Sequence, residues 1–178
     1  MISVEKFRIG SRTVWIAVLH NERVDGITFS LEKRLLDENI RRLTGFLQRR
    51  GVPVDPTPGE SEYPGIVRDV IEGKLDNEDV LKLLSFRGLT PFERKVYEWL
   101  TKSVKRGKVI SYGELARAIG TSPRAIGGAM KRNPYPIVVP CHRVVSKNGL
   151  GYYTPRLDEK LFLLEIEGVK TWTNSRRT

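Results

Sequence analysis

The chain has 178 residues, of which 39% are hydrophobic and 29% are charged. This balance is typical of one larger or two small globular domains and excludes a disordered chain. No apolar run approaches the ~18 residues of a membrane span, and the N-terminus lacks the apolar core of a signal peptide, so we expect a cytoplasmic protein (nuclear in a eukaryote) with no membrane partner. One cysteine excludes an internal disulfide framework, and one cysteine with two histidines argues against a zinc module, so we expect no metal.

The positive charge lies in the second half of the chain. Residues 1–84 hold 13 basic and 14 acidic residues, whereas residues 85–178 hold 18 basic and 7 acidic residues, which gives the net charge of +10. This asymmetry indicates that residues 85–178 meet a polyanion such as nucleic acid. A solvated, lysine-rich surface explains the same charge equally well, so charge alone leaves both interpretations open.

The first third of the chain has the pattern of an antiparallel sheet. Short alternating stretches at 2–9 and 26–31 flank an apolar run of strand length at 14–19, with short polar turns between them. Ile27 and Phe29 share one face of the third stretch. The three segments predict an antiparallel meander.

Helices follow the predicted meander. Leu36, Ile40, Leu43 and Leu47 have helical spacing, and Gly51 is a natural stop. A proline-rich loop, a helix from Pro64 and a short helix near residues 77–84 complete the segment. We therefore predict a small N-terminal α/β domain with an antiparallel sheet over residues 1–84, and we find no chemical site in it.

Clear helix caps mark the second half, after a connection at 85–90. Thr90 to Glu93 and Ser111 to Glu114 are capping boxes. The helix that begins at Ser111 stops at Gly120, and Ser122-Pro123 starts another that runs to Asn133. Two helices joined by a short turn containing glycine are typical of a helix-turn-helix. We predict that residues 85–178 form a mostly helical, winged helix-turn-helix-like domain, so the fold class is α+β.

The second helix of this pair contains the small residues Ala125, Gly127, Gly128 and Ala129. A glycine inside a helix costs about 1 kcal/mol relative to alanine. Close approach of another surface to the helix backbone explains that cost. Tight packing against a neighbouring helix also explains it and is the more common reason, so the sequence leaves both open.

The single cysteine lies in a segment that suits a reactive group. Three prolines and several β-branched residues surround Cys141, and His142 follows it directly. A cysteine reacts as its thiolate and needs a base nearby, although a lone cysteine is more often a small buried hydrophobe. Successive side chains of an extended segment point to opposite faces, so a water could link His142 to the sulfur. The predicted helix at 158–167 supplies candidate acids to orient the histidine.

The segment Pro140-Cys141-His142-Arg143-Val144 resembles the active-site signature of the O6-alkylguanine-DNA alkyltransferases, also named methylated-DNA–protein-cysteine methyltransferases. The similarity extends from about Thr90 to Gly168. It includes the stretches 109–116 and 124–130, Asn133-Pro134 and Glu167-Gly168. Several motifs in the same order make chance agreement very unlikely.

This resemblance implies roles for five residues of the reaction centre. Cys141 attacks the alkyl carbon and keeps the alkyl group. His142 takes the thiol proton through a water, and Glu167 orients His142. Asn133 braces the turn around Cys141, and Tyr112 donates a hydrogen bond or proton to the guanine.

The resemblance also implies a DNA interface and a base pocket. The second helix enters the minor groove, and Arg124 fills the gap left by the flipped base. The implied DNA contacts are Ser122, Arg124, Ala125, Gly127 and Lys131, and the implied pocket residues are Met130, Leu150, Tyr153, Thr154 and Pro155.

The function implied by the resemblance is stoichiometric DNA repair. The alkyl group of O6-alkylguanine, and by extension of O4-alkylthymine, passes to Cys141 of a monomer in a single turnover without a cofactor. Two alternatives remain: a lesion-binding, non-catalytic relative, which would lack the active cysteine, and a winged-helix regulator, which would not need Cys141-His142 beside its DNA-reading helix.

Overall fold

The computed structural model describes residues 1–147, 149 and 157–169. Its N-terminal part is a three-stranded antiparallel sheet, in the order β1-β2-β3, formed by β1 (Ile2–Ile9), β2 (Arg12–His20) and β3 (Val24–Ser30). Ile9 pairs with Arg12 across a tight turn at Gly10, whose φ of +59° favours glycine. The predicted meander is therefore confirmed.

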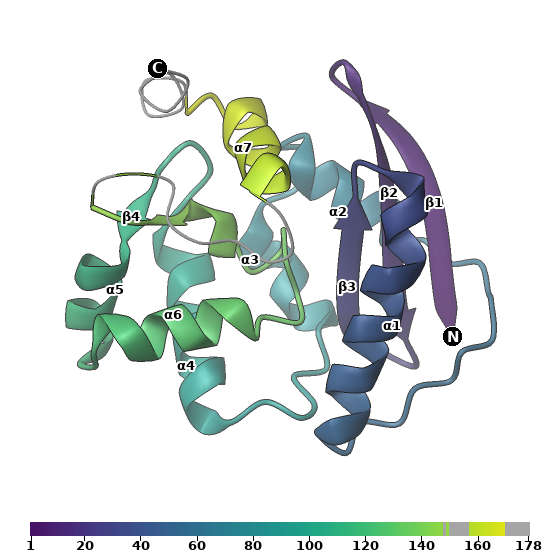
Figure 1. The fold of residues 1–178 in the computed structure, drawn as a ribbon, viewed down its shortest axis with the longest axis horizontal. Helices are drawn as coiled ribbons and strands as arrows, with labels where there is room; N and C mark the ends of the chain where they lie inside the picture. The colour runs from purple at the N-terminus through teal and green to yellow at the C-terminus, as the bar shows by residue number, and fades with distance from the viewer. Residues whose placement is uncertain (148, 150–156, 170–178) are drawn as a thin grey trace.

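Helices α1 (Lys33–Arg49) and α2 (Tyr63–Ile71) pack on this sheet, as Figure 1 shows for α1. Every residue of β3 is buried, including those on the face opposite Ile27 and Phe29. Gly26, on the face opposite Ile27 and Phe29, lies against α1. Ile27 and Phe29 belong to a core cluster that includes residues of the second half, so both faces of the strand are covered. The Ile27 amide donates to the Pro134 carbonyl at 2.8 Å. This bond satisfies one backbone group at the free edge of β3.

The second half is mostly helical, as predicted, and lies beside the sheet and α1 (Figure 1). Its two very short strands pair in parallel. The remaining elements are α3 (Asn77–Val80), η1 (Leu81–Leu83), α4 (Pro91–Ser103), β4 (Ile110–Ser111), α5 (Tyr112–Ile119), α6 (Pro123–Lys131), η2 (Cys141–Arg143), β5 (Val144–Val145) and α7 (Leu157–Ile166).

Both predicted capping boxes are present, at Thr90/Glu93 and at Ser111/Glu114. Gly120 ends α5 at a φ of +86°, in the left-handed region that glycine adopts without strain. Helix α6 ends at Lys131, slightly before the predicted end at Asn133. A residue before proline disfavours helical geometry, and Asn133 precedes Pro134.

One hydrophobic core joins the two halves of the chain. Phe29 of β3, Tyr97 of α4 and Val139 belong to the same buried cluster. A charged network reinforces this contact, because Arg50 and Arg132 both bind the buried carboxylate of Glu93, at 2.6 and 2.9 Å. The division into domains at residues 84 and 85 stays a prediction. No helix in the described part of the chain is long and apolar enough to cross a membrane.

Candidate active site and nucleic-acid interface

Cys141 opens the single turn η2 and is 7% exposed. The turn is fixed on both sides, because the Cys141 amide donates to the Val139 carbonyl at 2.8 Å and Val144 pairs with Ile110 of β4. The surrounding β-branched residues are buried. The sulfur therefore has little conformational freedom and little contact with solvent.

His142 and Glu167 form a buried pair next to Cys141. His142 Nε2 lies 2.9 Å from Glu167 Oε1, and the histidine is 1% exposed. Arg143 donates two hydrogen bonds to the same carboxylate, from Nε to Oε2 at 3.0 Å and from Nη2 to Oε1 at 2.7 Å. Glu167 is thus oriented by two neighbours from the Cys-His-Arg turn.

The electrostatics of this pair favour a neutral histidine beside an ionised glutamate. Complete burial lowers the pKa of His142 below its ordinary 6.5, although Glu167 opposes the shift. Burial works against ionisation of Glu167, but His142 and Arg143 outweigh it and hold its pKa well below the ordinary value. Nε2 of a neutral His142 then carries the proton that Glu167 accepts, and Nδ1 keeps its lone pair. Among the described residues, buried Nδ1 has no hydrogen-bond partner.

Asn133 spans the loop that leads to the cysteine. Its Nδ2 donates to the Val139 carbonyl at 3.1 Å, and its Oδ1 accepts from the Tyr135 amide at 2.9 Å. Both contacts lie within the segment 133–140. The side chain therefore ties the two ends of this segment together.

Asn77 of α3 holds the same loop from the N-terminal half and was missed by sequence analysis. Its Nδ2 donates to the carbonyls of Ile137 (2.7 Å) and Val138 (3.1 Å), and its Oδ1 accepts from Arg143 at 3.2 Å. Ile137 has a φ of +77°, which is costly for a β-branched residue. The contact could not be predicted from a local motif, because 60 residues separate Asn77 from Ile137.

Lys160 of α7 was also missed. Its side chain is 0% exposed, and Nζ donates to the Val144 carbonyl at 2.6 Å. Burial lowers its pKa to about 8, and the charge of Cys141 opposes that shift. Lysine is rarely buried unless it has a partner, and here the Val144 carbonyl is one. The sequence around Lys160 is that of an ordinary helix and gives no sign of this contact.

Helices α5 and α6 form the predicted helix-turn-helix pair and pack against each other. Arg124, Ser122 and Lys131 are exposed on α6 and its cap, and Ala125 is half-buried. The Ser122 hydroxyl accepts from the Ala125 amide at 3.1 Å and so caps the helix. Tyr112 begins α5 and packs half-buried against the core.

The glycines of α6 differ in their surroundings. Among the described residues, a Cβ added to Gly127 would meet nothing within 4 Å, whereas one added to Gly128 would meet the flexible end of Arg132 at 2.8 Å. Packing inside the protein therefore does not explain Gly127. Among the described residues, nothing covers Gly127, so the helix backbone can approach an external partner there.

The predicted base pocket lies only partly within the described residues. Met130 is half-buried near the end of α6. Leu150, Tyr153, Thr154 and Pro155 lie outside the described residues. In the part of the chain that the structure describes, no group of three or more His, Cys, Asp or Glu side chains could hold a metal ion.

Comparisons with known proteins cover nearly the whole chain. Residues 1–86 match the family described as "Methylated DNA-protein cysteine methyltransferase, N-terminal", and residues 91–169 match "6-O-methylguanine DNA methyltransferase, DNA binding domain". A methylated-DNA–protein-cysteine methyltransferase of Thermococcus barophilus is 61% identical over 175 residues, which cover 98% of this chain and all of the relative. The relative of Thermococcus kodakarensis is 59% identical over 98% of this chain and all of its own length.

Solved structures agree with these sequence matches. The crystal structure of the O6-methylguanine-DNA methyltransferase from Pyrococcus kodakaraensis has a TM-score of 0.93 at 59% identity and covers 94% of this chain and 99% of that one. The Mycobacterium tuberculosis OGT in complex with DNA has a TM-score of 0.65 at 26% identity, covering 96% of this chain and 95% of that one. From its sequence matches and its fold, this chain belongs to the methylated-DNA–protein-cysteine methyltransferase family.

Proposed function

We propose that this protein repairs DNA by moving the alkyl group of O6-alkylguanine in a duplex onto Cys141, in one irreversible turnover. The observation that supports this most directly is that Cys141, His142 and Glu167 lie next to one another and are buried. His142 Nε2 is bonded to Glu167, and His142 Nδ1 has no partner among the described residues. The names of the relatives and the DNA complex of the Mycobacterium tuberculosis protein support a methyltransferase that acts on DNA.

The proposed chemistry starts with the thiol proton. A water between Sγ of Cys141 and Nδ1 of His142 carries the proton to the imidazole, and Glu167 stabilises the imidazolium that forms. The thiolate attacks the alkyl carbon, a new S–C bond forms, and the C–O bond breaks with its electron pair on the guanine oxygen. Tyr112 supplies a hydrogen bond or proton to the departing guanine.

A single turnover follows from the product. The alkylated Cys141 is a thioether, a poor leaving group, and the proposed reaction contains no step that removes the alkyl group. The alkyl donor is the DNA itself, so the reaction needs no cofactor. O4-alkylthymine is a second substrate of the same chemistry, since it also presents an alkyl carbon on an oxygen of a planar base.

The proposed DNA complex centres on α6. Gly127 and Ala125 let the helix backbone approach the minor groove, Ser122 and Lys131 contact the sugar-phosphate walls, and Arg124 fills the gap left by the flipped base. We propose that one monomer acts on one lesion in the cytoplasm. The flipped base contacts Met130 and, by resemblance, Leu150, Tyr153, Thr154 and Pro155.

Intact-mass measurement tests the proposal. After incubation with a duplex that contains O6-methylguanine, the protein should gain one methyl group per chain, and peptide mapping should place it on Cys141. Cys141→Ser should gain none while it binds the duplex with unchanged affinity. Sustained turnover, or a methyl group on another residue, would contradict the mechanism, and binding of the lesion without transfer would favour the non-catalytic alternative.

A further inference from the structure

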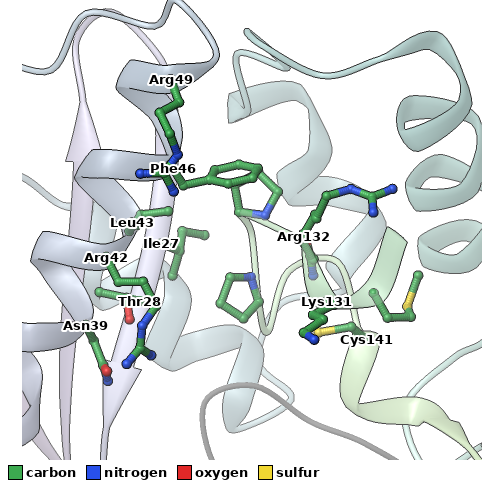
Figure 2. Close-up of a pocket in the computed structure, with 14 residues that line it drawn as sticks. Ile27, Thr28, Asn39, Arg42, Leu43, Phe46, Arg49, Lys131, Arg132 and Cys141 are labelled. Atoms are coloured by element: carbon green, nitrogen blue, oxygen red, sulfur yellow. The ribbon is translucent and has the colours of Figure 1, made fainter. Parts of the chain in front are cut away.

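A cleft of about 310 Å³ separates α1 from the segment that carries Cys141. Figure 2 shows its two walls: Arg42, Phe46 and Arg49 come from α1, and Lys131, Arg132 and Cys141 face them from the other half. Phe46, Met130, Pro134 and Pro136 make part of the lining apolar. The cleft therefore combines apolar surface with four cationic side chains.

The cleft has an excess of positive charge. Its described lining residues include Arg42, Arg49, Lys131 and Arg132 and no carboxylate side chain. The described lining of the cleft therefore carries four positive side chains, two of which pair with carboxylates outside it.

In the part of the chain that the structure describes, Glu38 and Glu93 pair with arginines of the cleft. Glu38 pairs with Arg42 at 3.2 Å in an exposed contact, which contributes little. Glu93 is shared between Arg132 and Arg50, so one negative charge serves two guanidinium groups. Arg49 has no ion pair among the described residues. The balance favours an anionic ligand.

The position of the cleft indicates which anion it meets. Lys131 and Arg132 lie at the end of α6, the second helix of the helix-turn-helix. Nine helical residues span about 13 Å, whereas the minor groove is only ~6 Å wide. Since the helix is longer than the groove is wide, the end of α6 that carries Lys131 reaches a phosphate wall of the groove, and the cleft opens at that end.

We propose that the cleft binds the phosphate backbone of the DNA under repair, so that Arg42 and Arg49 extend the DNA interface into the N-terminal half. This inference rests on the proposed function, because it assumes that the duplex lies on α6. It revises the expectation that DNA binding resides in residues 85–178 alone. Residues 51–84 hold 8 of the 14 acidic residues of the first half. The net charge of the whole half is therefore close to zero even though α1 itself is basic.

Paired double variants on α1 test this inference. Arg42→Gln/Arg49→Gln removes two charges from the cleft, and Arg34→Gln/Arg41→Gln removes two exposed charges of the same helix that do not line it. Affinity for an unmodified duplex is measured by fluorescence anisotropy over a series of salt concentrations. Loss of two phosphate contacts should weaken binding roughly tenfold and make the log–log salt slope shallower by about 2 in the cleft variant only. Equal behaviour of the two variants would overturn the inference.

Two further measurements separate the possible failures. Transfer from free O6-benzylguanine, which has no phosphate, should proceed in the Arg34→Gln/Arg41→Gln variant at the rate of the unmodified protein, because neither arginine lines the cleft. If the unmodified protein shows no transfer to Cys141, the proposed function fails, while the salt slopes still decide whether the cleft binds DNA. If millimolar inorganic phosphate binds the unmodified protein but not the cleft variant, and both variants bind DNA equally, the cleft takes free phosphate and the DNA assignment is wrong.

Discussion

Asn77 Nδ2 lies 2.7 Å from the carbonyl oxygen of Ile137, although the two residues belong to different halves of the chain. The same side chain contacts Val138 and Arg143, so it holds both the approach to Cys141 and the turn that follows it. Ile137 occupies a left-handed conformation that costs of order 1–3 kcal/mol and persists only when its surroundings enforce it. The N-terminal half therefore contributes to the geometry of the reaction centre.

Asn77→Ala should lower both stability and transfer rate. It removes the side-chain bonds to the carbonyls of Ile137 and Val138 and one of the bonds of Arg143, which costs about 1–3 kcal/mol, and it releases the loop before Cys141. Urea unfolding should report the loss of stability, and single-turnover transfer should slow while affinity for DNA stays constant. Thr101→Val is the matched control, because it removes a buried bond to the Tyr97 carbonyl far along the chain from this loop. Equal transfer rates in the two variants at equal stability would contradict the bracing role.

His142→Ala should slow transfer by about 10²-fold, the ordinary scale of general-base assistance. Because burial lowers the pKa of His142 below 6.5, the imidazole is neutral at pH 7 and able to accept a proton. The transfer rate of the unmodified protein should therefore stay constant as pH falls from 8 to 6.5 and decrease only at lower pH. Single-turnover rates with free O6-benzylguanine measure this profile without DNA binding. An unchanged rate in His142→Ala would show that the histidine is only structural.

Lys160→Met should change how stability depends on pH. Burial lowers the pKa of Lys160 to about 8, from 10.5 in the unfolded chain, so the folded state loses its proton first. Between these values the unfolded state binds more protons, and the free energy of unfolding contributed by this group rises with pH. The difference between the unmodified protein and Lys160→Met should therefore change by about 3 kcal/mol from pH 8 to 10.5. Urea unfolding across this range checks it, and parallel curves for the two proteins would reject a buried charge at Lys160.

Local patterns were the most predictable part of this structure. The capping boxes at Thr90 and Ser111, the stop at Gly120 and the meander depend on residues a few positions apart, and the structure confirms them. The complete burial of β3 depends on α1 at one face and on the core shared with the second half at the other, which periodicity within one strand does not reveal.

The site divides in the same way. The resemblance around Cys141 pointed to His142 and Glu167, and the structure places their side chains 2.9 Å apart. Asn77 and Lys160 reach the cysteine turn only through tertiary packing, and neither lies in a recognisable motif. Their contribution could not be seen without the fold.

Gly127→Ala should separate stability from DNA binding. Alanine is favoured over glycine in a helix by about 1 kcal/mol. The added methyl meets no described residue within 4 Å, so the free protein should become more stable. The same methyl projects toward the proposed DNA surface and should weaken binding to the duplex. Thermal unfolding and fluorescence anisotropy measure the two effects. Gly65→Ala in α2 is the control, since its methyl has ordinary room and lies on another helix. Tight DNA binding by Gly127→Ala would show that the backbone does not approach the groove here.

Arg124→Ala tests whether the exposed arginine at the start of α6 holds open the gap left by a flipped base. If it does, its loss removes the group that offsets unstacking, which costs a few kcal/mol. Repair of O6-methylguanine in a duplex should then fall steeply even when all DNA is bound. Lys131→Ala, at the other end of α6, removes a phosphate contact and should weaken binding with little effect on repair at saturation.

Free O6-benzylguanine separates flipping from chemistry, because no base has to leave a stack. The rate of transfer from free O6-benzylguanine should be nearly equal in the unmodified protein, Arg124→Ala and Lys131→Ala. Neither side chain takes part in the reaction at Cys141 in the proposed mechanism. A slow reaction of Arg124→Ala with the free base would instead indicate damage to the reaction centre. Equal repair rates of the two variants on saturated duplex would show that Arg124 only contacts phosphate, because a phosphate contact affects the rate through binding alone and saturation removes that effect.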